Sequence, residues 1–197
     1  MACELTDPRL AMQPVRMRLV TGRDPYETVI GAVRQAQTSI WIATANLKEM
    51  RVEVAGRRRY RSVLDVLDDR VATGVEVRLL HAALPSRPFR DAFDGYPRLV
   101  AGGMELRLCP RVHMKAVVVD GRLLYLGSAN WTGAGLGAKS VERRNFELGI
   151  LTDDEGLLDA VQAEIDRIWR GAACGTCRLR DTCEAPLDLD FGPPADR

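Results

Sequence analysis

One stretch in the middle of the chain constrains the fold more than any other. Apolar residues occupy alternate positions from 112 to 118, and the pair Asp120-Gly121 is followed by an apolar run over residues 123–126. Alternation is typical of a strand, and Asp-Gly is a strong signal for a two-residue hairpin turn. The stretch therefore predicts a β-hairpin, in which His113 and Lys115 lie on one face of the first strand.

Groups that suit phosphate chemistry gather around this hairpin. The imidazole of His113 can attack phosphorus or carry a proton, while the ammonium of Lys115 neutralises a phosphate oxygen. Ser128 and Asn130 follow the hairpin, and both carry hydrogen-bond donors that a phosphate can accept. Glu147 belongs to a second expected strand and could hold an imidazole in one tautomer. Singly these residues have ordinary structural explanations, so the prediction depends on their spacing.

That spacing is His-x-Lys-x(4)-Asp-x(6)-Gly-Ser-x-Asn, and it resembles the signature of the phospholipase D superfamily. The segment Asn-Phe-Glu at residues 145–147 resembles the downstream acidic element of that family. The resemblance implies that a histidine attacks phosphorus, giving a phosphohistidine, and that the histidine of a second copy acts as general acid. The implied roles are nucleophile or acid for His113, phosphate ligand for Lys115, Ser128 and Asn130, and orientation of His113 for Glu147.

Two further titratable residues have structural alternatives. Asp120 occupies the aspartate position of the signature and belongs to the candidate catalytic set, but its place in an Asp-Gly turn is explained by backbone geometry alone. We therefore expect a structural role for Asp120 before a catalytic one. His81 ends an expected strand over residues 75–81 and has no lysine two residues later. We expect it to be structural or peripheral.

Length and composition restrict the remaining possibilities. A chain of 197 residues, 46% of them hydrophobic, can bury one full core, so we expect one domain over residues 1–171 and a small tail over residues 172–197. With a net charge of +1, nucleic-acid affinity must come from a local patch. The sequence shows no signal peptide and no run of roughly 20 apolar residues, which favours a cytoplasmic protein without stable membrane association.

The order of expected elements indicates an α/β fold. Strands are expected at residues 15–20, 39–45, 75–81, 104–108, 112–119, 123–126 and 145–151, and helices after Asp24-Pro25, from Arg57, near residues 89–93 and after Thr152. A helix, a glycine and a strand in succession are typical of parallel α/β units. With the family resemblance, this order predicts a mixed central sheet with helices on both faces.

A basic cluster stands before the second expected helix and comprises Arg57, Arg58, Arg59, Tyr60 and Arg61. One interpretation is a solvated helix start. The other is a nucleic-acid-binding patch, in which guanidinium groups bind phosphates and the tyrosine stacks on a base. The second interpretation is slightly favoured, because positive charge opposes the dipole at a helix N-terminus.

The tail contains a cysteine run, C-x(2)-C-x(5)-C, formed by Cys174, Cys177 and Cys183. Its short spacing lets three thiolates converge on one metal, and a reducing compartment favours metal binding over disulfides. The run resembles the C-terminal part of the iron–sulphur motif of RecB-type and CRISPR-associated exonucleases. The resemblance implies a structural iron–sulphur cluster, most simply [4Fe-4S], with zinc as the alternative. Cys3 is the expected fourth ligand, and Cys109 is the other candidate.

These observations predict a phosphodiesterase, and most simply a nuclease that cleaves DNA or RNA through a phosphohistidine without a catalytic divalent ion. Two alternatives stay open: a phospholipase acting on lipid phosphodiesters, and an inactive nucleic-acid-binding subunit of a larger defence or repair assembly. The chain has one His-x-Lys motif, whereas the family's site uses two. The resemblance therefore implies a twofold homodimer in which both His113 side chains meet one phosphate.

Overall fold

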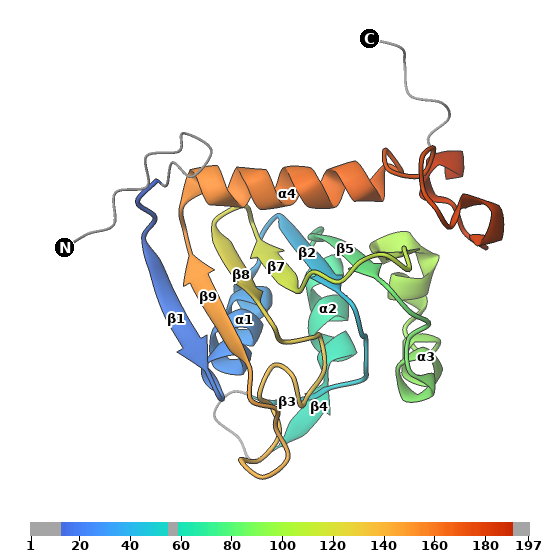
Figure 1. The fold of residues 1–197 in the computed structure, drawn as a ribbon. Coiled ribbons are helices and arrows are strands. Elements are labelled where there is room, and N and C mark those ends of the chain that lie inside the picture. Colours follow the sequence, from blue (N-terminus) through green and yellow to red (C-terminus); the bar gives the residue numbers. More distant parts are fainter. Residues whose placement is uncertain (1–12, 55–58, 191–197) are drawn as a thin grey trace.

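A seven-stranded mixed sheet forms the centre of the protein, whose computed structural model describes residues 13–54 and 59–190. The strands lie in the order β1-β9-β8-β7-β2-β5-β6. Their bounds are Met17–Thr21 for β1, Ser39–Thr44 for β2, Glu76–His81 for β5, Met104–Leu108 for β6, Ala116–Val119 for β7, Leu123–Gly127 for β8 and Leu148–Thr152 for β9 (Figure 1). β2, β5 and β6 are parallel, and the other neighbours pair antiparallel. The expected mixed sheet is confirmed.

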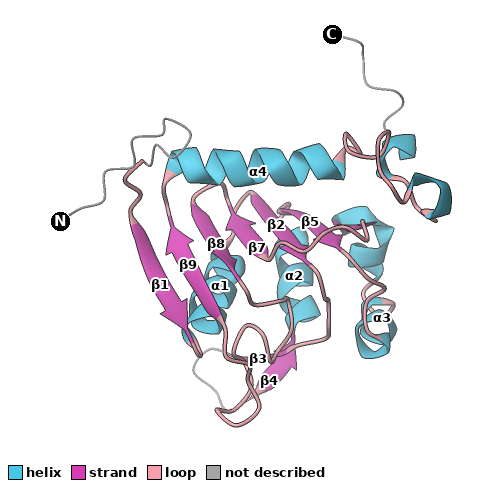
Figure 2. Cartoon of the chain, viewed as in Figure 1, coloured by secondary structure: helices cyan, strands magenta, loops and turns pink. Residues whose placement is uncertain are grey.

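Helices cover both faces of this sheet, as Figures 1 and 2 show. On one face, α1 (Asp24–Gln35) and α2 (Val63–Val71) bury their apolar sides in a large hydrophobic cluster. On the other face, α4 (Glu155–Trp169) packs through a second cluster. The short helix α3 (Arg87–Phe93) follows β5 and contributes its phenylalanines to the first cluster. Helices on both faces are thus confirmed.

Local sequence signals explain where three helices begin. α1 has Pro25 in its first turn, where a missing N–H costs nothing. α4 is capped by Asp154, whose carboxylate accepts the N–H of Leu157 at 2.9 Å. α2 has a reciprocal capping box, in which Ser62 accepts the N–H of Leu64 and Asp65 accepts that of Ser62.

The capping box also corrects the expected start of the second helix. Residues Tyr60–Ser62 form strand β4, which pairs antiparallel with β3 (Arg51–Glu53), so α2 starts at Val63. The prediction that Arg57 opens this helix was therefore wrong. The physical reason is that the serine satisfies the free N–H groups of the first turn, which an arginine side chain cannot do.

Two expected strands beside the site begin three or four residues later than the sequence pattern predicted. β7 begins at Ala116, so His113 and Lys115 lie in the segment that leads into it rather than on the strand. Pairing with β2 ends at this point, since Ala116 is opposite Ala43 and β2 ends at the next residue. β9 begins at Leu148, and the preceding Phe146 is fully exposed rather than buried.

The cysteine-containing tail packs against the sheet-and-helix body. It contains two short 3-10 helices, Arg180–Thr182 and Leu187–Asp190, and Leu187 is buried in the same cluster as Trp169 of α4. The division between residues 171 and 172 into two units stays a prediction. None of the helices in the described ranges is long and apolar enough to cross a membrane.

Candidate active site

One end of the sheet brings the predicted site residues together. β7 and β9 begin at this end, and β2 and β8 finish there. His113 and Lys115 precede β7, Ser128 and Asn130 follow β8, and Glu147 precedes β9. Antiparallel pairing of β7, β8 and β9 therefore places residues from three loop segments at the same end of the sheet.

The two residues of the His-x-Lys motif are in contact. Lys115 is only 8% exposed, and its Nζ lies 3.1 Å from Nδ1 and 3.3 Å from Nε2 of His113. The same ammonium donates to the His113 carbonyl oxygen at 2.6 Å. Burial lowers the pKa of Lys115, and the negative charge of Glu147 partly opposes that shift. The imidazole itself is exposed, so a substrate can reach it.

Glu147 is held through both carboxylate oxygens. Ser128 Oγ donates to Oε2, and the side-chain amide of Asn145 donates to Oε1 at 3.0 Å. The Leu148 N–H donates to Ser128 Oγ at 3.1 Å, which ties the end of β8 to the start of β9. Asn145 had no role in the sequence-based prediction, although it lies two residues from Glu147. The role of Glu147 in orienting His113 stays a prediction.

Asn130 is positioned by the end of β2. Its side-chain oxygen accepts the N–H of Asn46 at 3.0 Å and lies 3.2 Å from Thr44 Oγ1, which accepts the Trp131 N–H at 2.9 Å. With the oxygen held this way, the NH₂ group is the part of the amide that can donate to a phosphate. Sequence reasoning missed Thr44 and Asn46, and their one signal was a polar pair at the end of an apolar strand.

The sequence between α1 and the end of α4 identifies the family. Residues 29–169 match the family described as cardiolipin synthase, PLD-like domain. The chain belongs to this PLD-like family. It is also 37% identical over 59 residues to the mitochondrial cardiolipin hydrolase of Xenopus tropicalis, a match that covers 30% of this chain and 25% of that protein. The match thus spans only a quarter of that relative.

Solved structures share the PLD-like fold. NucT from Helicobacter pylori superposes with a TM-score of 0.57 at 16% identity, over 78% of this chain and 95% of that one. Nuc from Salmonella typhimurium, a phospholipase D family member, gives 0.54 at 19% identity over 79% and 95%. The archaeal chromatin protein TrmBL2 gives 0.54 at 16% identity over 85% and 57%. At these identities the likeness establishes the fold alone.

Two glycines shape the PLD-like site where β8 meets β9. Gly127 pairs with Gly149, and the buried ring of Tyr125 lies over both. A methyl group at Gly149 would lie 2.5 Å from Cε2 of that ring, and one at Gly127 would lie 2.6 Å from the hydroxyl oxygen. Burial raises the pKa of Tyr125. Glycine at both positions therefore makes room for a large ring beside Ser128.

Asp120 lies at the other end of β7 from the His-x-Lys motif of this PLD-like domain. Asp120 and Gly121 have φ values of 54° and 61°, which confirms the expected two-residue turn. The carboxylate accepts the N–H groups of Gln37, Thr38 and Ser39 at 2.8 to 3.0 Å. Burial alone would raise the pKa of Asp120, but these hydrogen bonds outweigh it and lower the pKa. The geometry favours the structural role over the catalytic one.

His81 is the last residue of β5 and lies at the same end of the sheet as the site. Its side chain, however, contacts a backbone group of its own segment. Its side chain is buried, and Nδ1 lies 2.9 Å from the carbonyl oxygen of Ala83. Burial lowers the pKa of His81. These observations favour the expected structural role.

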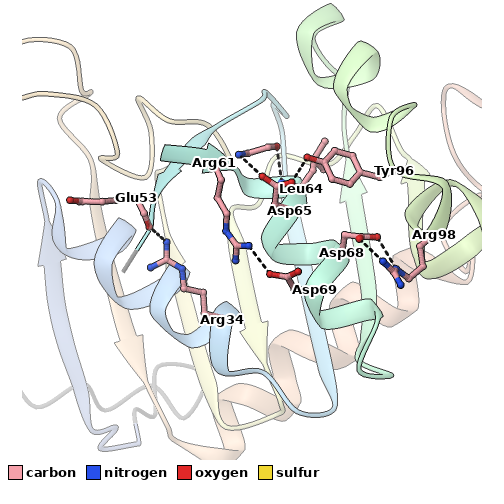
Figure 3. A network of polar contacts seen from close by, with 10 residues as sticks. Arg34, Glu53, Arg61, Leu64, Asp65, Asp68, Asp69, Tyr96 and Arg98 are labelled. Carbon is pink, nitrogen blue, oxygen red and sulfur yellow. Dashed lines mark hydrogen bonds and ion pairs between the residues drawn. The ribbon is translucent and has the colours of Figure 1, made fainter. Parts of the chain in front are cut away.

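The basic cluster is only partly within the described residues. Residues 57–58 lie outside them, and Arg61 donates to Asp69 of α2 at 2.7 Å (Figure 3). Its charge is therefore compensated inside the chain. Arg59 and Tyr60 are exposed at the start of β4. The predicted nucleic-acid patch consequently depends on these two side chains and on the part outside the described residues.

Cys3 also lies outside the described residues, whereas Cys174, Cys177 and Cys183 line one pocket together with Cys109. The thiols of these four are free and half-buried. Within residues 13–54 and 59–190, no three histidine, cysteine or acidic side chains are arranged so that they could hold a metal ion. A metal centre in this PLD-like protein therefore stays a prediction.

Proposed function

We propose that the protein is a phosphodiesterase that cleaves nucleic acid and uses His113 as its nucleophile. The observation that carries the proposal is the exposed imidazole in contact with the buried ammonium of Lys115, at the end of the sheet where Ser128 and Asn130 follow β8. Family membership supports this assignment, because the match covers the whole constellation.

In the proposed reaction, an imidazole nitrogen of His113 forms a bond to phosphorus and one ester oxygen leaves with the electrons of its bond. A general acid protonates that oxygen. Water then attacks phosphorus and gives a proton back to the group that served as general acid. This attack breaks the bond to nitrogen and frees the imidazole. Lys115 neutralises a non-bridging oxygen throughout, and its burial makes that attraction stronger than it would be in bulk water. Ser128 and Asn130 supply neutral donors.

The choice of nucleic acid over lipid is supported by three observations. NucT and Nuc match this chain over almost their whole length, and TrmBL2 is described as a DNA-binding protein. Arg59 and Tyr60 are exposed at the start of β4, and the segment that leads into β3 contacts the site, because Leu47 pairs with Trp131 just after Asn130.

Lipid hydrolysis is the second candidate, and a specific observation favours it. The chain matches part of a protein named as a cardiolipin hydrolase, whose name indicates a lipid substrate. In addition, Phe146 and Leu148 expose apolar surface on both sides of Glu147. An acyl chain could cover such a surface.

A second copy of this protein could also cover this surface. The single His-x-Lys motif supports a twofold dimer, in which the second copy supplies the general acid.

The test compares substrates and histidines under one set of conditions. Purified protein is incubated with labelled DNA, labelled RNA and vesicles that contain cardiolipin or phosphatidylcholine. We expect cleavage of nucleic acid, its abolition by His113→Ala, and little change with His81→Ala. If only the lipid vesicles are hydrolysed, lipid replaces nucleic acid as the proposed substrate. Equal losses in the two variants would place the site elsewhere.

A further inference from the structure

A pocket joins the tail of the chain to the end of β6. Cys109, from the β6 end, and three cysteines of the tail line it, although they come from distant parts of the sequence. The rest of the lining is mainly apolar and includes Leu108, Leu179 and Leu187. Four of the five cysteines in the chain therefore face one small space.

The backbone of the tail turns its cysteines toward that space. The Cys177 N–H donates to the Cys174 carbonyl at 3.1 Å, and the Arg180 N–H donates to that of Cys177 at 2.9 Å. The Cys183 N–H closes the next turn on Arg180 at 3.4 Å. Successive tight turns bring residues that are three or more apart to one side of the segment.

Two arginines lie beside the four thiols. Arg111 and Arg180 both line the pocket, and Arg180 also forms an ion pair with Asp188 at 2.5 Å. Four thiolates around a divalent ion carry a net negative charge, so nearby guanidinium groups would stabilise them. Apolar residues and two arginines give no packing reason to bring four oxidisable thiols together. The same surroundings suit four thiolates that bind a metal.

From this placement we propose that Cys109, Cys174, Cys177 and Cys183 bind one thiophilic metal centre, either zinc or an iron–sulphur cluster. The fourth ligand is then Cys109 rather than Cys3. In the described residues the four sulfurs do not form a closed ligand set, so metal binding requires these half-buried side chains to change rotamer. Thiolates select these metals over hard cations.

The same placement connects the metal to the active site. The Cys109 N–H donates to the carbonyl of His81 at 2.8 Å, and the Val112 N–H donates to that of Cys109 at 2.9 Å. The turn that Cys109 opens leads directly to His113. A metal bound to Cys109 would fasten this turn to the tail and hold the imidazole in position. Cys109 is thus a positioning residue, and this part of the inference depends on the proposed role of His113.

The test measures metal content directly. Protein purified without oxygen is analysed for zinc, iron and sulfide, and an absorbance at about 400 nm marks a cluster. We expect Cys109→Ser to lose the metal as completely as Cys177→Ser, and Cys3→Ser to keep it. Metal-free wild-type protein, or loss in Cys3→Ser with retention in Cys109→Ser, overturns the proposal. His113→Ala is expected to keep the metal, so failure of the catalytic proposal would be seen separately.

Alkylation of the wild-type protein covers the case in which a variant fails to fold. Iodoacetamide labelling is followed at each cysteine by mass spectrometry before and after a strong chelator strips the metal. We expect Cys109 to become labelled several-fold faster after stripping, together with the tail cysteines, and hydrogen exchange to speed up over residues 110–115. An unchanged rate at Cys109 beside increased rates in the tail contradicts its assignment.

Discussion

At the scale of single residues, the environment of Lys115 decides what the site can do. An ammonium on the surface is surrounded by water, which screens its attraction for a phosphate. Lys115 is buried beside an exposed imidazole, and its pKa is lowered by that burial. The charge of Glu147 opposes the shift and favours the ammonium form. Lys115 is therefore a poorly solvated cation at the place where the negative charge of a bound phosphate is expected to lie.

The same constellation predicts activity without a catalytic divalent ion. Its carboxylate, Glu147, is already bonded through both oxygens to Ser128 and Asn145. We expect turnover to survive brief EDTA treatment that leaves thiolate-bound metal in place, as checked by metal analysis of the treated sample. Complete loss of activity that added magnesium restores would remove the phosphohistidine mechanism.

Asp120 offers a residue-level test of stability. Asp120→Asn keeps a side chain that tolerates positive φ, but it weakens the hydrogen bonds to residues 37–39, so we expect a loss of about 1–2 kcal/mol in the free energy of unfolding at pH 7. The folded-state pKa lies below the unfolded value of about 3.9. The carboxylate's contribution is therefore complete above that value and is lost as the pH falls through the folded-state pKa.

Denaturant unfolding of both proteins at pH 7 and near pH 3 checks this expectation. The difference between wild type and Asp120→Asn is expected to shrink at the lower pH. Activity per folded molecule is expected to stay near the wild-type value, since the turn lies at the far end of β7 from His113. A large loss of activity in fully folded Asp120→Asn would restore Asp120 to the catalytic residues.

At the scale of elements, the site depends on how the ends of β8 and β9 meet. Ser128 directly follows β8 and Glu147 directly precedes β9, next to the paired Gly127 and Gly149, and the Leu148 N–H links the two strand ends through Ser128. The ring of Tyr125 fills the space that two side chains would otherwise take. Small residues in these strands thus keep the backbones close and the large ring buried.

Gly149→Ala tests that arrangement. The added methyl group would lie 2.5 Å from the Tyr125 ring, so the ring or the strand must move. We expect a loss of roughly 1–3 kcal/mol in stability, as for other overpacked cores, together with lower activity. Gly31→Ala in α1 is the matched control, because nothing lies within 4 Å of its added methyl group. It is expected to stabilise the protein by about 0.5–1 kcal/mol. Similar melting temperatures for the two variants would contradict this account.

At the scale of the whole molecule, the number of histidine motifs predicts a dimer. General acid catalysis contributes roughly 10²–10⁴ in rate, and one His-x-Lys motif cannot both attack phosphorus and protonate the leaving oxygen. A twofold axis beside the site would bring a second His113 to the same phosphate. The exposed Phe146 and Leu148 would then become buried between the two copies.

Mixing of subunits tests the shared site. Wild-type protein is combined with an excess of His113→Ala chains under conditions that allow exchange, and activity is compared with dilution into buffer. We expect a greater loss than dilution causes, because mixed dimers would lack one histidine. Sedimentation of a fully active monomer at the assay concentration would rule out the shared site and require a second catalytic group in this chain.

Features that depend on near neighbours in the chain were predictable from the sequence. Asp120-Gly121 forms the expected turn, α1 starts at Asp24 with proline in its first turn, and α4 is capped by Asp154. The PLD-like fold was implied by the resemblance of the motif to the phospholipase D signature, and of the six motif positions only Asp120 lies away from the site, at the other end of β7.

Features that depend on neighbours in space were decided only by the tertiary structure. Alternating residues predicted a strand through Lys115, but pairing with β2 ends at Ala116, and without a partner the segment before it is not a strand. The partner of Arg61 is Asp69, and the cysteines of the tail share a pocket with Cys109. Each of these contacts joins residues that local propensity treats separately, since packing and pairing are set by what the folded chain brings alongside.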